Sequence, residues 1–150
     1  MYQSILVPLD GSSHAEKALQ VAAQLAKGTS AVLHLMTVAE FPPDNLGLFT
    51  GGTAEPFSEE DREKLAAGMK EEAHKVIDKA RATVDLSGIE AKEVVRQGRQ
   101  AELITAEAEK LGVDAIVMGS RGVSDLRGMV FGSVSHKVSH TAGCTVITVT

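Results

Sequence analysis

The chain of 150 residues is 43% hydrophobic and 23% charged, which is ordinary for one soluble globular domain. Its net charge of −5 and its few aromatic residues (four Phe, one Tyr, no Trp) argue against a nucleic-acid surface, which normally has a basic stripe and aromatic platforms. No apolar run approaches the roughly 20 residues of a membrane span, no signal peptide is evident, and the lone Cys144 excludes an internal disulfide, so the sequence predicts a cytoplasmic protein.

Five runs along the chain have the pattern of strands. Most are short and apolar, which is typical of strands covered on both faces in a parallel sheet. The third run is more polar, which suits a strand at a sheet edge. The predicted strands span residues 4–9, 31–38, 90–97, 114–118 and 144–149.

Amphipathic runs between these strands predict four helices. The first follows the first strand at once, with Ser13 and Glu16 at the spacing of a capping box and Gly28 as its C-terminal stop. The second has the same capping pattern at its start, with Ser58 and Asp61. Its apolar stripe, expected to face the core, consists of Leu65, Met69, Ala73, Val76, Ala80 and Val84. The three later helices are expected at 58–84, at 101–111 with Gly112 as the C-terminal stop, and from about residue 133.

Alternating strands and helices with short loops predict an α/β domain, built as one open five-stranded parallel sheet with helices on both faces. The strand order 3-2-1-4-5 fits the right-handed crossover rule. This order reverses direction between the first and fourth strands, and ligands of open α/β sheets bind in the crevice at that point. The loops that leave these two strands, "PLDGSS" and "MGSRGVSDLRGMVFGS", are therefore the expected ligand site.

The second of these loops is rich in glycine. Gly119, Gly122 and Gly132 follow the spacing G-x2-G-x9-G, and Ser133 comes next. Glycine lets a ligand approach the backbone without meeting a Cβ atom, and the start of a helix at Gly132 offers free amides to an anion. The same spacing also fits a plain surface loop in which Ser133 caps the helix, so both interpretations stay open.

Hydroxyl and cationic side chains accompany these glycines. Ser133 and Ser135 place hydroxyl donors in the first helical turn, and Arg121 and Arg127 are available as counter-charges for a phosphate chain. The sequence has no G-x-x-x-x-G-K-[ST] pattern of P-loop NTPases, and the turn after the first strand lacks the dinucleotide pattern G-x-G-x-x-G. The composition of the loop suits a polyphosphate that is bound in neither of those two ways.

Three blocks of the sequence resemble the universal stress protein (UspA-like) family. They are "ILVPLDGS", the G-x2-G-x9-G-[ST] spacing and "GSVSHKVSHTAGCTVITV", and the resemblance covers essentially all 150 residues. It implies a flavodoxin-like fold of the adenine nucleotide alpha hydrolase-like kind, a homodimer and, for the subgroup with this spacing, ATP as ligand. Two departures stand out: Met36-Thr37 replaces a frequent His-Val pair, and "HTAGCTVITVT" replaces a common Ala-Pro-Cys-Pro-Val.

The resemblance also implies a binding site. Asp10 lies near the adenosine or a magnesium ion, a role that its place at the end of the first strand favours over that of a turn aspartate. The backbone of Thr37 contacts the adenine, Met118 and Gly119 lie beside the ribose, and the start of the last helix holds the phosphates. The candidate metal ligand is Asp10, and the candidate cofactor-binding residues are Pro8, Asp10, Thr37, Met118, Gly119, Arg121, Gly122, Gly132, Ser133, Val134 and Ser135.

Other notable residues favour structural roles. His136 and His140 are four residues apart, a spacing that can hold zinc, but no third ligand is evident and exposed helix histidines are favoured. His34 is expected in the core and Cys144 in packing at the start of the last strand. The loop 40–57 either covers the nucleotide or is a simple insertion, and the sequence leaves both open.

Three functions are compatible with these patterns: a nucleotide-dependent regulatory module of the stress response with an unknown protein partner, a slow ATPase or autophosphorylating enzyme, and an apo structural dimer. Phosphoryl transfer needs metal ligands and a group that orients the nucleophile. No carboxylate or glutamine besides Asp10 is expected near the site, which favours binding without efficient turnover. The exposed edge of the strand 144–149 must be covered, which predicts a homodimer through this strand. No nucleic acid or membrane partner is expected.

Overall fold

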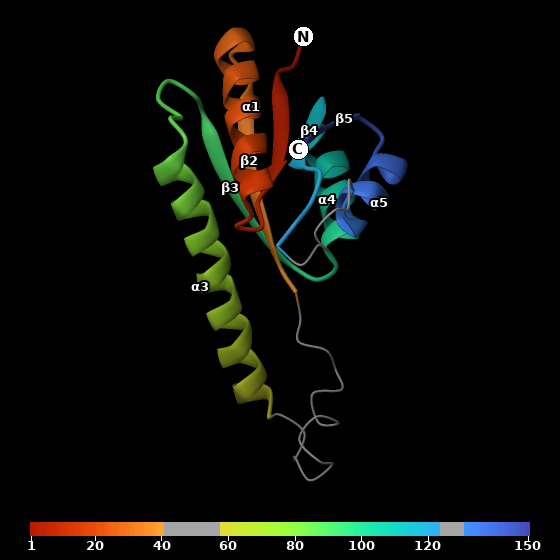
Figure 1. Ribbon diagram of the computed structural model, residues 1–150. Helices are drawn as coiled ribbons and strands as arrows, with labels where there is room; N and C mark the ends of the chain where they lie inside the picture. Colours follow the sequence, from red (N-terminus) through yellow and green to blue (C-terminus); the bar gives the residue numbers. More distant parts are fainter. Residues whose placement is uncertain (41–57, 124–130) are drawn as a thin grey trace.

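Five parallel strands form one sheet in the order β3-β2-β1-β4-β5, which confirms the predicted order (Figure 1). The computed structural model describes residues 1–40, 58–123 and 131–150. Neighbouring strands all run in the same direction, so their carboxyl ends meet at one edge of the sheet. The strands are β1 (Ser4–Pro8), β2 (Val32–Ala39), β3 (Ala91–Gln97), β4 (Ala115–Gly119) and β5 (Thr145–Val149).

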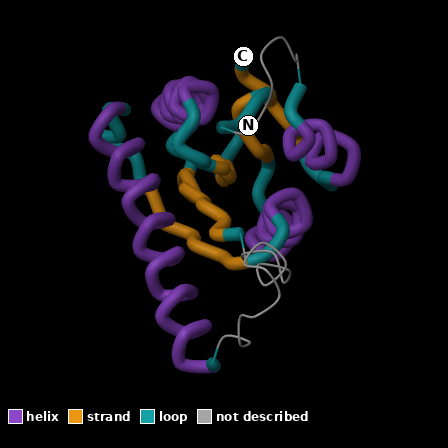
Figure 2. Tube along the Cα trace, turned by 60° about the horizontal axis from the view of Figure 1, so that its bottom comes forward, coloured by secondary structure: helices purple, strands orange, loops and turns teal. Residues whose placement is uncertain are grey.

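Among the described residues, two helices cover each face of this sheet (Figures 1 and 2). One pair packs against side chains such as Ile5 and Leu33, and the other pair packs against Leu6 and Met36. Successive side chains of a strand point to opposite faces, so each strand contributes to both layers of the core. The first pair is α1 (Ser13–Thr29) and α3 (Glu59–Thr83), and the second is α4 (Gln100–Leu111) and α5 (Ser133–Thr141).

The two ends of α1 lie close to the predicted positions but not at the predicted residues. Ser12 caps the helix in place of Ser13, because the Ala15 amide donates to the Ser12 Oγ at 3.1 Å. At the other end the helix continues past Gly28 to Thr29, and Ser30 is the left-handed residue that ends it, with φ of 58°. The predicted Gly112 stop of α4 is confirmed, with a left-handed φ of 60°.

The helix α3 begins at the predicted cap but buries less of its stripe than expected. The Asp61 amide donates to the Ser58 Oγ at 3.2 Å, as a capping pattern requires. Leu65, predicted to face the core, is 41% exposed because this half of the helix extends past the end of the sheet (Figure 1). Its fully buried apolar residue is Ile77. Neither this long charged helix nor any other described helix is apolar enough to cross a membrane.

Candidate functional site

An open cleft lies at the carboxyl ends of β1 and β4, where the strand order reverses. Its volume is about 830 Å³ when the solvent at its mouth is counted. All the predicted cofactor-binding residues line it except Thr37 and Gly132. The lining residues are Pro8, Leu9, Asp10, Ala15, Met36, Val38, Glu40, Gln100, Ile104, Met118, Gly119, Arg121, Gly122, Val123, Ser133, Val134 and Ser135.

Asp10 ties together the two loops that form the cleft. Its Oδ1 accepts a hydrogen bond from the Ser12 amide at 2.9 Å, which forms a tight turn before α1. Its Oδ2 accepts from the Val123 amide, 3.3 Å away in the loop after β4. A carboxylate has about four lone-pair sites, so these two bonds leave capacity for a ligand or for a metal-bound water.

The end of β4 lies directly against the start of α1. A Cβ atom on Gly119 would be 2.8 Å from the His14 Cβ and 3.0 Å from the Ala15 amide nitrogen. Beside this contact, the Nη2 atom of Arg121 lies 3.0 Å from the Nε2 atom of His14. Gly119 is therefore required for the packing of a strand on a helix, a reason that differs from the expected contact with a ribose.

Ser120 joins the end of β4 to α5 and to β5. It is 1% exposed, and its amide donates to the Val149 carbonyl at 2.8 Å. Its carbonyl accepts two hydrogen bonds of 2.6 Å, one from the Gly132 amide and one from the hydroxyl of Ser135. The sequence assigned both of these donors to a phosphate, but in the structure they hold the loop to the helix. Gly132 has φ of −78° and ψ of 163°, which is ordinary extended backbone.

The start of α5 has no side-chain cap. The amides of Ser133 and Val134 have no acceptor among the described residues, and both residues line the cleft. Free amides and the helix dipole together favour an anion at such a helix start. The hydroxyl of the exposed Ser133 adds a further donor at the same place.

At the end of β2, Val38 lines the cleft, whereas Thr37, the residue that the sequence assigned to the adenine contact, does not. The Met36 carbonyl accepts from the Leu9 amide at 2.7 Å and so faces β1, whereas the Ala39 carbonyl faces the β3 side, where the Gly98 amide donates to it at 3.0 Å. Peptide groups alternate along a strand, so those of Val38 face the β1 side, where β1 has already ended. Thr37 is buried instead, and its hydroxyl has no partner within the described part of the chain.

Two polar side chains of the cleft were missed from the sequence. Glu40 follows β2, and Gln100 is the first residue of α4. The expectation that Asp10 has no carboxylate or glutamine near it is therefore wrong. Both residues could have been identified from the predicted parallel topology, because the residues after β2 and after β3 reach the same edge of the sheet as those after β1.

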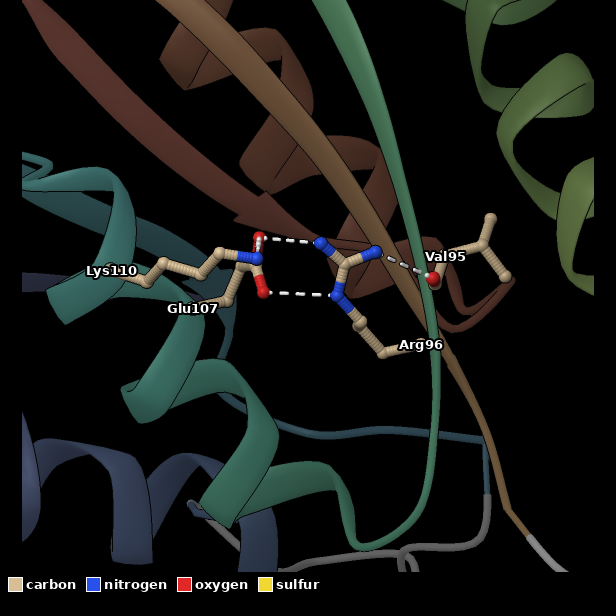
Figure 3. A network of polar contacts seen from close by, with 4 residues as sticks. All are labelled: Val95, Arg96, Glu107 and Lys110. Carbon is tan, nitrogen blue, oxygen red and sulfur yellow. Dashed lines mark hydrogen bonds and ion pairs between the residues drawn. The ribbon is translucent and has the colours of Figure 1, made fainter.

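The helix α4, which carries Gln100 into the cleft, is fixed to β3 by a paired ion bridge (Figure 3). The Nε and Nη2 atoms of Arg96 donate to the two carboxylate oxygens of Glu107 at 3.0 and 2.8 Å. A third guanidinium nitrogen donates to the Val95 carbonyl at 3.0 Å. The Glu107 side chain is 7% exposed, so its charge depends on this partner, with Lys110 at 4.0 Å as a weaker second one.

The remaining residues singled out from the sequence lie away from the cleft. His34 is buried, with its Nε2 atom 3.1 Å from the Ser4 Oγ, which confirms a core residue with a partner; burial lowers its pKa. Burial raises the pKa of the Cys144 thiol. The rings of His136 and His140 are 4.5 Å apart on α5, and the described ranges hold no group of three His, Cys, Asp or Glu suited to a metal. Arg127 and the loop 41–57 lie outside the described residues.

Comparison with known proteins gives consistent matches over the whole chain. The family model described as "Universal stress protein family" matches residues 1–150. The chain is 36% identical over 149 residues to universal stress protein YxiE of Bacillus subtilis, which covers 99% of each chain. UspA from Lactobacillus plantarum has a similar structure, with a TM-score of 0.76 and 26% identity over 99% of this chain and 98% of that one. A universal stress protein from Archaeoglobus fulgidus in complex with dAMP has a TM-score of 0.58 and 25% identity over 99% of this chain and 98% of that one.

Proposed function

The chain belongs to the universal stress protein family, and we propose that it binds an adenine nucleotide, ATP with magnesium, in the cleft between the ends of β1 and β4. The observation that carries this proposal is the uncapped start of α5. The Ser133 and Val134 amides there have no acceptor among the described residues, and both residues line the cleft. The complex of an Archaeoglobus fulgidus relative with dAMP supports an adenine nucleotide as the ligand.

The two ends of the cleft suit the two ends of a nucleotide. Met36, Val38 and Ile104 supply apolar side chains at the β2 end of the cleft. The peptide groups of Val38 have no backbone partner among the described residues, and they suit hydrogen bonds to the edge of a base. The phosphates then lie at the start of α5, where amides and the helix dipole favour negative charge. Magnesium prefers few protein carboxylates together with phosphate and water ligands, and the spare acceptor capacity of Asp10 suits that coordination.

Nucleotide occupancy is proposed to act as a regulatory signal to a protein partner rather than to support efficient turnover. A slow ATPase is the second candidate, because the cleft also holds the Glu40 carboxylate and the Gln100 amide, groups that can orient water. Release of phosphate over many turnovers by the purified protein, lost in Glu40→Gln, is the result that favours the enzyme. Stable binding without phosphate release favours the regulatory module.

We also propose a homodimer through β5. This strand is the last in the order and pairs with β4 alone among the described strands. The Val149 carbonyl faces β4, because it accepts from the Ser120 amide at 2.8 Å, so the peptide groups of Thr148 face outward by alternation. An uncovered strand edge of this kind favours pairing with a second copy. Sedimentation equilibrium at micromolar concentration tests the dimer, and a monomer excludes it.

The nucleotide site is tested by removing one amide from the start of α5. Ser133→Pro is suited to this purpose, because proline is well tolerated at the first helical position and the extended Gly132 is compatible with a following proline. The change also removes the Ser133 hydroxyl, and the loss of these donors to a charged phosphate is expected to weaken ATP binding about tenfold or more. Adenosine, which has no phosphate, should bind unchanged.

Glu59→Pro is the matched control, because Glu59 is the first residue of α3 and also follows an extended cap. Calorimetric titration of both variants with ATP and with adenosine, together with thermal unfolding, separates loss of the site from loss of the fold. If folded Ser133→Pro binds ATP as tightly as the wild type does, the phosphates do not lie at α5 and the proposed site is excluded.

A further inference from the structure

We propose that His14 positions Arg121 in the cleft, and that this contact gives the site its preference for phosphorylated ligands over the bare nucleoside. The inference rests on the nucleotide site proposed above. It assigns a role to a residue of α1 that does not itself line the cleft. The contact that carries it is the 3.0 Å separation between the Arg121 Nη2 and the His14 Nε2, across 107 positions of sequence.

Among the described residues that line the cleft, Arg121 is the one basic side chain. The same lining contains two carboxylates, those of Asp10 and Glu40. The described part of the lining therefore has a negative side-chain charge toward an anionic ligand unless Arg121 is in place. The helix dipole of α5 contributes about half a unit of positive charge, which does not by itself offset both carboxylates.

His14 is well suited to hold this arginine, because its own backbone packs closely against the end of β4. The backbone of His14 lies against Gly119 so closely that an added Cβ would be 2.9 Å from the His14 carbonyl carbon. Arg121, in contrast, is on the loop after β4, in a segment held by backbone hydrogen bonds at Ser120 and at Val123. A long arginine side chain has considerable rotamer freedom, and a fixed partner removes part of that freedom before the ligand arrives.

The chemistry of the contact fixes the state of the histidine. Arginine has five N–H donors and no acceptor, so the His14 Nε2 must accept and its proton must lie on Nδ1. One guanidinium N–H is then used by His14, and the others remain for phosphate oxygens. Only an acceptor atom is needed at this position. Glutamine should therefore hold Arg121 as His14 does, whereas an apolar residue of similar size should not.

The test uses His14→Leu and His14→Gln, titrated with adenosine, AMP and ATP by calorimetry. We expect His14→Leu to weaken ATP binding about five- to tenfold and adenosine binding less than twofold, because Arg121 acts on the phosphates. His14→Gln should stay within about twofold of the wild type for all three ligands, since its side-chain oxygen accepts the same hydrogen bond. His74→Leu is the control, because His74 lies on α3 and does not line the cleft. The affinity of this variant for each of the three ligands should equal that of the wild type.

Two further measurements decide whether the effect passes through Arg121. The double variant His14→Leu/Arg121→Gln should bind ATP no more weakly than Arg121→Gln alone, because the two residues act as a unit. The ¹⁵N spectrum of the His14 ring in the ligand-free protein should report the Nδ1–H form and should shift in Arg121→Gln.

The outcomes separate this inference from the proposal on which it rests. ATP binding that is unchanged in His14→Leu overturns the role of His14 while the nucleotide site stands. An equal loss of adenosine and ATP affinity also overturns it, because that result assigns His14 to the general shape of the cleft. A wild type that binds no nucleotide at all overturns the proposed function, and the specificity claim is overturned with it.

Discussion

The substitution Gly119→Ala should destabilise the protein even though it adds a single methyl group. The added carbon would lie 2.8 Å from the His14 Cβ, 2.9 Å from the His14 carbonyl carbon and 3.0 Å from the Ala15 nitrogen. Favourable contacts between carbon atoms are about 3.5 to 4.0 Å, so β4 or α1 must move by several tenths of an ångström. Two of the three close atoms belong to the backbone, and a side-chain rotation cannot relieve the contact.

The expected magnitude follows from two opposing effects. Extra methyl groups in well-packed regions typically cost about 1–3 kcal/mol. Replacement of glycine by alanine also restricts the unfolded chain, which stabilises the fold by about 0.4–1 kcal/mol. We therefore expect a net loss of about 1–2 kcal/mol, which corresponds to a decrease in Tm of roughly 2–8 °C for a chain of this size.

Urea unfolding and thermal unfolding measure this loss, and Gly68→Ala is the matched control. Gly68 is exposed on α3, and an added Cβ there meets no atom within 4 Å. The same chemical change should therefore stabilise the protein at this position by about 0.5–1 kcal/mol. If Gly119→Ala is as stable as Gly68→Ala, the close approach of β4 to α1 is absent and the structural reason given for Gly119 is wrong.

Two further predictions concern the faces of the sheet away from the cleft. Arg96→Met leaves the 7%-exposed Glu107 side chain without its paired partner; because Arg96 itself is partly exposed, we expect a loss of about 1–3 kcal/mol, below the usual cost for a fully buried pair. Urea unfolding measures this loss, and the double variant Arg96→Met/Glu107→Leu should recover part of it. If the stability of Arg96→Met is within about 0.5 kcal/mol of the wild type, which is about the precision of such comparisons, the argument is contradicted. Burial lowers the pKa of His34 below its ordinary 6.5. The unfolded chain therefore binds the proton more readily than the folded protein does. The contribution of the neutral His34 to stability is full above about pH 6.5 and decreases as the pH falls below that value. His34→Gln should make the decrease between pH 7.5 and pH 5 smaller, as followed by urea unfolding at each pH, and an unchanged decrease assigns it to other groups.

The architecture was predictable because it depends on few and strong signals. Buried runs that alternate with amphipathic runs leave few topologies, and the crossover rule selects one of them. The residues at which helices and strands begin and end are harder to predict, because neighbouring residues of similar type can serve equally well as the end. Ser12 and Ser13 are equally good caps by residue type, and the Asp10 carboxylate decides between them because it binds the Ser12 amide at 2.9 Å. This hydrogen bond depends on the backbone conformation of the turn before α1, which residue types alone do not specify.

The candidate site was predictable in its place but not in the roles of its members. The switch point identified both loops, since it follows from strand order alone. Val38 lines the cleft and Thr37, the residue chosen from the sequence, does not. The sequence alone does not specify this, because the direction in which each peptide group faces is set by the register of β2 on β1. The sequence also does not show that the Gly132 amide is already used by the Ser120 carbonyl.

The glycine spacing therefore reflects at least two separate structural requirements, whereas the sequence-based interpretation assigned all of its glycines to a single ligand site. Gly119 is needed for contact between a strand and a helix, and the Gly132 amide holds the loop to Ser120. Neither requirement involves a ligand, whereas the free Ser133 and Val134 amides and the Arg121 side chain do not depend on glycine at their own positions. A related chain could keep Gly119 and Gly132 for the sake of its fold and still not bind the proposed nucleotide, if its Arg121 or the open start of its α5 were changed. We therefore expect nucleotide binding within such proteins to follow these groups more closely than it follows the spacing.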